Sequence, residues 1–331
     1  SALSNLPKLE QLYLAFLTID GTCFKDFADS QTLRSLTVEY ADNLSDEGAQ
    51  HIANLPNLEV LKLQTGFGKG KLTTAGIQAI VNKRLPSTFE FDKKLIDDDL
   101  FKLLVDKGWL YGPSPAGSKK EKPATAAEVK SISLDGTKVT DKGFEAVLDC
   151  TNTEYLFLSK TGISDVTFKK LGDFRKLKYL SLGGTKVTTE GLNAVASAPI
   201  DHLALEGNTL TEDTFKAIGR MKGLEELWLR GAKMKSEWLK HIATLPKLKE
   251  LNLMGAAFED SAAQYLKTMP ALQRLTLNNT NLGDKGFEEI IKIPTLKSLN
   301  LDSTKVTKDA YLKAKKSHPK LRLYNYRHNR K

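Results

Sequence analysis

The hydrophobic positions of this chain repeat the pattern Leu-x-x-Leu-x-Leu, in which x is mostly polar. Segments that fit this pattern, some with another apolar residue in place of leucine, cover residues 9–14, 33–38, 58–63, 129–134, 153–158, 177–182, 200–205, 224–229, 248–253, 272–277 and 296–301. Most of their starts lie 23 to 25 residues apart. Alternation of apolar and polar residues over a short run predicts a β-strand with one buried face. The chain is therefore expected to be a stack of similar units.

Each predicted strand is followed by a turn and then by a helix. The turn reads Gly-Thr-Lys-Val-Thr-Asp-Lys-Gly-Phe at residues 136–144, and related sequences return at 184–192, 279–287 and 303–310. Thr or Ser before an acidic residue predicts a helix start, because the hydroxyl accepts a hydrogen bond from a free backbone N–H group. One strand and one helix cannot bury their own apolar faces, but stacked units form a continuous leucine core. We therefore expect a right-handed α/β solenoid with parallel strands on its concave face and helices on its convex face.

Residues 86–109 lack leucine at the strand positions. Phe89 and Phe91 occupy these positions instead, and Phe101 and Leu104 fit the buried face of a helix. This segment is therefore predicted to be a fourth repeat.

Residues 112–128 are rich in Pro, Gly, Ser and Lys and are expected to form a flexible loop. The repeat pattern is complete on both sides, with four repeats in residues 1–111 and eight in residues 129–320. We therefore favour a single solenoid over residues 1–331, with two separate arrays as the alternative. Residues 321–331 are expected to form a basic C-terminal cap.

The first residues match the end of a repeat. Residues 3–12 resemble residues 52–61 almost position by position, and the chain has no initiating Met. We therefore expect a processed or shortened chain that begins inside the last helix turn of a preceding unit. A bacterial exported or cell-envelope protein is favoured over a cytoplasmic one, and the chain could be the recognition part of a larger multidomain protein.

With these repeats, the chain resembles the leucine-rich repeat family over nearly its whole length. Its 24-residue unit is similar to the cysteine-containing type and to related repeats of bacterial proteins, with threonine where the first type carries cysteine, at Thr137, Thr161, Thr185, Thr280 and Thr304. The resemblance implies a horseshoe-shaped scaffold that recognises a protein partner on its concave face. It also implies no catalysis and no cofactor, and we expect a monomer.

The residues between the strand leucines are expected to line the concave face, because strand side chains alternate between two faces. The candidate partner-binding residues on this face are Tyr155, Phe157, Tyr179, His202, Trp228 and Arg230, with Met254 beside them and Glu206, Glu226 and Glu250 at the rim. Exposed aromatic residues next to arginine are typical of binding hot spots. The alternative is strand propensity alone, which explains Tyr and Phe better than an outward Trp. Tyr13, Phe16 and Tyr40 form a second candidate.

The formal net charge of +9, from 49 Lys plus Arg and 40 Asp plus Glu, lies wholly in the last part of the chain. Residues 305–331 hold ten basic residues and one acidic residue, Asp309. Such a cluster could neutralise the phosphates of a nucleic acid or the charges of another anionic polymer. It also covers the last strand, where charges prevent pairing with another chain. We favour edge protection, so nucleic acid is not expected as a partner. An anionic polymer, or a carbohydrate stacked on the aromatic residues, remains an alternative ligand.

Residue spacing predicts neither a catalytic site nor a metal site. The five histidines are scattered, and the sequence has no HExxH or CxxC motif. Cys23 is expected to be a small buried thiol rather than a reactive one, and Cys23 and Cys150 are both expected to be free thiols. Gly66–Lys71 lies where a phosphate-binding loop belongs, but lacks the first Gly and the final Ser or Thr of that motif, so it is interpreted as a lengthened turn. No segment approaches the ~18 apolar residues of a membrane span.

Overall fold

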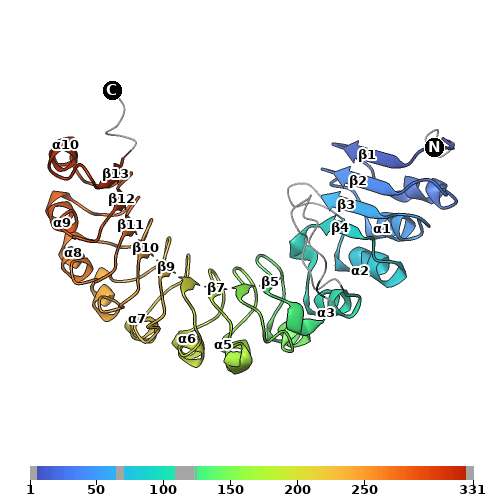
Figure 1. Ribbon diagram of the computed structural model, residues 1–331. Coiled ribbons are helices and arrows are strands. Elements are labelled where there is room, and N and C mark those ends of the chain that lie inside the picture. Colours follow the sequence, from blue (N-terminus) through green and yellow to red (C-terminus); the bar gives the residue numbers. More distant parts are fainter. Residues whose placement is uncertain (1–5, 65–70, 109–122, 124, 326–331) are drawn as a thin grey trace. The chain divides into compact units, whose positions relative to one another are not determined.

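The computed structural model describes residues 6–64, 71–108, 123 and 125–325 (Figure 1). The chain divides into two compact units, residues 1–149 and residues 150–331. In both units, parallel strands alternate with helices, as expected for an α/β solenoid. Most of the predicted loop at 112–128 and of the turn at 66–71 lies outside the described residues. Within the described residues, no helix is both long and apolar enough to cross a bilayer.

The first unit contains a four-stranded parallel sheet in the order β1-β2-β3-β4. The strands of this sheet are β1 (Gln11–Ala15), β2 (Ser35–Glu39), β3 (Val60–Gln64) and β4 (Thr88–Phe91). The first unit, residues 1–149, also contains the strand β5 (Ser131–Ser133). Its helices, with 3-10 helices labelled η, are η2 (Thr22–Phe27), α1 (Asp46–Ala53), α2 (Thr74–Lys83), η3 (Lys93–Leu95), α3 (Asp98–Asp106), η4 (Ala126–Glu128), α4 (Asp141–Phe144) and η5 (Glu145–Val147). The register aligns one core row, Leu12, Leu36, Leu61 and Phe89.

The predicted fourth repeat is present as β4 and α3. Phe89, Phe101 and Leu104 are buried as expected. Phe91 is only half-buried, although it is aligned with the buried Leu63 of β3. Whether residues 1–331 form one solenoid or two arrays stays a prediction.

In the second unit, the strands lie on the inner side of the curve and the helices on the outer side (Figure 1). The parallel strands follow one another as β6 (Tyr155–Phe157), β7 (Tyr179–Ser181), β8 (His202–Ala204), β9 (Glu226–Trp228), β10 (Glu250–Asn252), β11 (Arg274–Thr276), β12 (Ser298–Asn300) and β13 (Arg322–Tyr324). The helices are α5 (Asp165–Phe168), η6 (Leu171–Asp173), α6 (Thr189–Val195), α7 (Glu212–Ile218), η7 (Ser236–His241), η8 (Asp260–Ala262), α8 (Ala263–Leu266), α9 (Asp284–Ile290) and α10 (Lys308–Ser317).

Several of the returning segments are 3-10 helices, where the apolar spacing alone predicted ordinary helices. Examples are η2 in the first unit and η7 in the second. A 3-10 helix rises about 2.0 Å per residue, compared with about 1.5 Å for an α-helix. It therefore spans a repeat with fewer residues, which suits a unit of this length.

The threonines that replace cysteine in the repeat close the turn after each strand. Each hydroxyl donates a hydrogen bond to the carbonyl oxygen three residues earlier, with oxygen–oxygen distances of 2.8, 2.6, 2.9, 2.7 and 2.8 Å at Thr137, Thr161, Thr185, Thr280 and Thr304. The carbonyl oxygen of the same turn thus accepts from the hydroxyl, so the threonine can be buried without leaving its hydroxyl unpaired.

An aspartate at the start of one helix also caps the start of the next helix. Asp165 accepts hydrogen bonds from the backbone N–H of Thr188 (2.8 Å), its hydroxyl (2.6 Å) and the N–H of Gly191 (3.0 Å). The same carboxylate-to-threonine pair joins Asp46 to Thr73, Asp98 to Thr140 and Asp284 to Thr307. Hydrogen bonds to a charged acceptor are among the stronger ones, so this inter-repeat cap holds neighbouring repeats together.

The inter-repeat cap explains why glycine follows in the helix. A Cβ atom on Gly191 would lie 2.4 Å from Oδ1 of Asp165, and one on Gly76 would lie 2.5 Å from Oδ1 of Asp46. Only glycine lets the carboxylate approach the backbone N–H this closely.

Gly191→Ala is expected to lower the free energy of unfolding by about 1 to 3 kcal/mol, because Asp165 or α6 must move. Gly223→Ala is the matched control, since its Cβ would lie 3.5 Å from the carbonyl oxygen of Ile200, an ordinary contact. The control is expected to change stability by less than about 0.5 kcal/mol. Chemical denaturation followed by circular dichroism measures both variants, and equal losses would contradict the role of the cap.

Candidate functional site

The predicted binding residues lie on four neighbouring strands of the second unit. Tyr155 and Phe157 are the first and last residues of β6, Tyr179 and His202 are the first residues of β7 and β8, and Trp228 is the last residue of β9. The middle residue of each of these strands is a buried leucine. The first and third residues therefore point to the other side, which we call the sheet face.

Tyr179 joins these side chains into one group, the aromatic cluster of Tyr155, Phe157, Tyr179, His202 and Trp228. Its ring centroid lies 4.8 Å from that of Phe157, 5.9 Å from that of His202 and 6.5 Å from that of Tyr155. Trp228 meets Tyr179 edge to face, at 6.4 Å and 83°. These separations are in the range of favourable aromatic pairs.

Small residues make room for Tyr179 at the centre of the aromatic cluster. The register places Phe157, Ser181, Ala204 and Trp228 in one row across β6 to β9. Ser181 and Ala204, between the two large rings, are buried. Tyr179 contacts the rings at both ends of this row, so we infer that its ring covers the two small residues.

The aromatic cluster is partly exposed to solvent. Tyr155 is 44% exposed, and the other four members are half-buried. The indole nitrogen of Trp228 is buried and has no hydrogen-bond partner among the described residues. Met254, which follows β10, is also half-buried.

Arg230 is exposed two residues after Trp228. Among the described residues, its guanidinium group has no hydrogen bond or ion pair. The five aromatic candidates therefore contact one another in the structure. Arg230 is near them in the sequence, and no contact with them is shown within the described part of the chain.

A charged network continues from His202 along the first residues of the next strands. His202 Nε2 lies 3.4 Å from Oε1 of Glu226, and Nη2 of Arg274 lies 3.0 Å from the same oxygen. Arg274 also forms an ion pair with Glu250 through Nε, and Nδ1 of His202 lies 2.5 Å from Oδ1 of Asp201. The hydrogen bond to Glu250, together with Glu226, raises the pKa of Arg274 above its ordinary value.

Sequence reasoning did not include Arg274 and Asp201 in the site. Glu226 and Glu250 face each other in the register of β9 and β10, and Arg274 follows in the same row on β11. The sequence did contain a signal for Arg274, namely a cation at the same strand position in the repeat after two glutamates. Like charges on adjacent strands repel unless a cation bridges them.

The second candidate lies in the first unit, on Tyr13, Phe16 and Tyr40. Tyr13 is 63% exposed, Phe16 77% and Tyr40 40%, and the rings of Phe16 and Tyr40 stack with centroids 4.5 Å apart. Phe16 and Tyr40 have φ angles of 57° and 53°, at the turn position where Gly136 and Gly184 lie in other repeats. Bulky residues rarely adopt this left-handed conformation, so this exposed pair is held at a cost in backbone energy.

Both cysteines are free thiols, but only Cys150 is buried. Cys23 is half-buried, so the prediction that it is buried is only partly right. Its partial burial raises the pKa of its thiol. Cys23 occupies the repeat position that is glycine in other repeats, for example Gly48 and Gly191. In this repeat Gly21 makes the close contact with the neighbouring helix instead, since a Cβ on Gly21 would lie 2.7 Å from the Cα of Gly48. In the part of the chain that the structure describes, no group of three or more His, Cys, Asp or Glu side chains could hold a metal ion.

The model of the family described as Leucine Rich repeat matches residues 175–196, which include β7 and α6. The chain is built from leucine-rich repeats. Solenoids of such repeats commonly act as scaffolds that bind other proteins on an extended surface.

Three solved structures have a similar chain course. An internalin (InlF) of Listeria monocytogenes is 17% identical with a TM-score of 0.48, over 96% of this chain and 86% of that one. A leucine-rich repeat protein of Leptospira interrogans is 17% identical with a TM-score of 0.45, over 98% and 97%. A chain from the complex of Rad7 and Elc1 in yeast is 19% identical with a TM-score of 0.43, over 90% and 77%. No curated protein matches the sequence.

Arg274→Ala is expected to lower the free energy of unfolding by about 1 kcal/mol at low salt, because Glu226 and Glu250 then face each other without a bridging cation. The loss should shrink at high salt, where charges are screened. Arg230→Ala is the control, since this arginine has no ion pair among the described residues, and it should change stability by less than about 0.5 kcal/mol. Urea denaturation at two salt concentrations measures the difference, and a loss that is the same at both would contradict the network.

Proposed function

We propose that this chain is a non-catalytic leucine-rich repeat scaffold that binds a protein partner through the sheet face of residues 150–331. The aromatic cluster and Arg230 form the centre of the binding surface. The observation that carries this proposal is the contact of five aromatic side chains from four adjacent strands, on the face away from the core.

The chemistry of the aromatic cluster suits a protein ligand. Aromatic side chains offer large apolar area and lose little conformational freedom on binding, and Tyr, Trp and Arg are the residues most often found at binding hot spots. Ring contacts with Tyr179 already restrict the other members, which lowers the entropic cost of association. An unpaired Arg230 favours a partner with a carboxylate opposite it.

The charged network forms one side of this surface. Arg274 pairs with both Glu226 and Glu250, so it offsets part of their negative charge without the partner. A polar rim of this kind excludes water and fixes the position of the partner more than it raises affinity.

The basic C-terminal region has a separate role in this proposal, which is to protect the edge of the sheet. Among the strands that the structure describes, β13 pairs only with β12, and Arg322 and Tyr324 are exposed on it. The hydroxyl of Tyr311 in α10 donates a hydrogen bond of 3.1 Å to the carbonyl oxygen of Leu323, which fixes β13 to the last helix. An exposed arginine on an edge strand discourages pairing with another chain.

Photo-crosslinking tests the proposed surface directly. With p-benzoylphenylalanine at Tyr155, the chain is expected to capture a discrete protein from an extract of the cells that produce it. The same group at Val166, which is 54% exposed on α5, is the matched control and should not capture that protein. Tyr179→Ala combined with Trp228→Ala should reduce capture through position 155 about tenfold or more.

The double variant must remain folded for this result to count. It is expected to do so, unlike Leu229→Ala, which empties a fully buried core position and costs about 2 to 5 kcal/mol. Circular dichroism checks this. Identical captured proteins from positions 155 and 166, or undiminished capture by the double variant, would contradict the proposal.

A further inference from the structure

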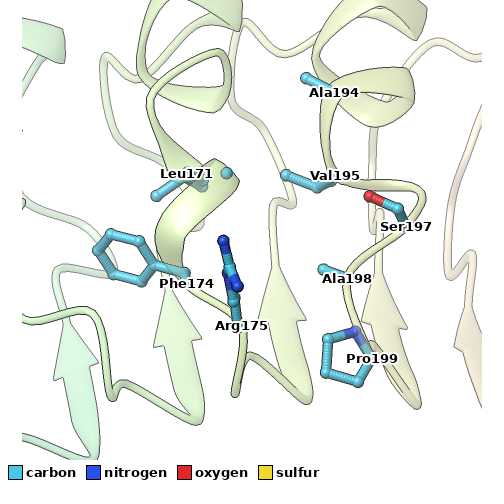
Figure 2. Close-up of a pocket in the computed structure, with 9 residues that line it drawn as sticks. Leu171, Phe174, Arg175, Ala194, Val195, Ser197, Ala198 and Pro199 are labelled. Atoms are coloured by element: carbon cyan, nitrogen blue, oxygen red, sulfur yellow. The ribbon is translucent and has the colours of Figure 1, made fainter.

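A separate cavity of about 350 Å³ lies in the second unit, between the segments that lead from helix to strand in two neighbouring repeats (Figure 2). Its walls include Leu171, Arg175, Val195, Ala198 and Pro199. None of these residues belongs to a strand, so the cavity is not part of the sheet face.

The repeat sequence explains why this cavity exists. The repeat that starts at Leu177 is followed 23 residues later by Ile200, whereas the next starts, Leu224 and Leu248, follow at intervals of 24. The missing residue falls in the segment before Ile200. This repeat is therefore too short there to close against its neighbour.

A small side chain enlarges the gap. Ala198 occupies the position filled in other repeats by larger apolar residues that are buried, namely Phe174, Met221, Leu245, Met269 and Ile293. Ala198 itself is only half-buried. Gly172, Arg175, Ala194, Ser197 and Pro199 in the lining are exposed, so the cavity opens to solvent at this seam.

The side chain of Arg175 supplies a positive charge at this cavity. Arg175 lies between the segment of Leu171 and the segment of Val195 to Pro199 (Figure 2). Its aligned position is proline in several other repeats, at Pro199, Pro246, Pro270 and Pro294. Among the described residues, the Arg175 guanidinium group has no hydrogen bond or ion pair.

We propose that this cavity binds a small free organic monocarboxylate with an apolar body. The carboxylate pairs with the guanidinium group of Arg175, whose donors suit a two-oxygen anion. The apolar body packs against Leu171, Val195, Ala198 and Pro199. The volume lies at the lower end of the roughly 300–1,000 Å³ of small-molecule sites, which suits one ring or a short branched chain.

Isothermal titration calorimetry with 3-phenylpropionate as the probe tests this site. The wild-type chain is expected to bind it with a Kd of about 1 mM or below. Two related probes, 3-phenylpropionamide without the charge and acetate without the ring, should each bind about tenfold more weakly. A short peptide ending in phenylalanine represents a protein C-terminus and should also bind more weakly than the free acid.

Substitutions locate the binding within the cavity. Arg175→Gln should weaken binding of 3-phenylpropionate about tenfold, and Ala198→Met should abolish it while leaving the chain folded, because methionine fills this position in other repeats. Lys176→Gln is the matched control, since Lys176 is exposed, adjacent and outside the lining, and it should bind as wild type does.

Three results would overturn the proposal. The first is no heat of binding from the wild type at about 10 mM 3-phenylpropionate. The second is equal binding of the acid and the amide, or by wild type and Arg175→Gln. The third is tighter binding of the peptide than of the free acid, which would assign the cavity to a protein terminus instead.

Discussion

At four junctions among the described residues, the placement of neighbouring repeats depends on the inter-repeat cap, in which one carboxylate closes the start of the next helix. Asp165 fixes both the height and the rotation of α6, because it binds two backbone N–H groups and one hydroxyl at once. The glycine that admits it keeps the two helices close. With the helices held in this way, the strand leucines align in rows, and the strands follow at the spacing of a hydrogen-bonded sheet.

That constraint leaves the outward strand positions free for recognition. In β6 to β9, the core uses the middle leucine of each strand, while the first and third residues contribute little to the stack of repeats. Aromatic residues at these positions come within ring contact because the repeats set their spacing. Tyr179 can span from Phe157 to Trp228 since Ser181 and Ala204 are small. Stability and recognition therefore rest on different residues of the same strand.

Features that repeat along the chain could be predicted from the sequence, whereas features of single repeats could not. The leucine period predicted the strands, and Phe89 and Phe101 revealed a repeat without leucines at its strand positions. The outward aromatics could be named because alternation in a strand is simple. The bridge from Arg274 to Glu226 depends on how far a side chain reaches across two strands, and the exposure of Cys23 depends on which residue makes the close helix contact. The cavity beside Ala198 left a trace in the 23-residue interval, but its shape required the packing of two neighbouring segments.

In the proposed function, the sheet face of residues 150–331, and not the helix side, meets the partner. Hydroxyl-radical footprinting measures this through the oxidation of individual side chains, with and without the partner protein recovered by crosslinking. We expect Tyr155, Tyr179, Trp228 and Met254 to become protected, while Val166 in α5 and Tyr265 in α8 are oxidised as before. Protection of Val166 and Tyr265, with unchanged oxidation of the aromatic cluster, would contradict it.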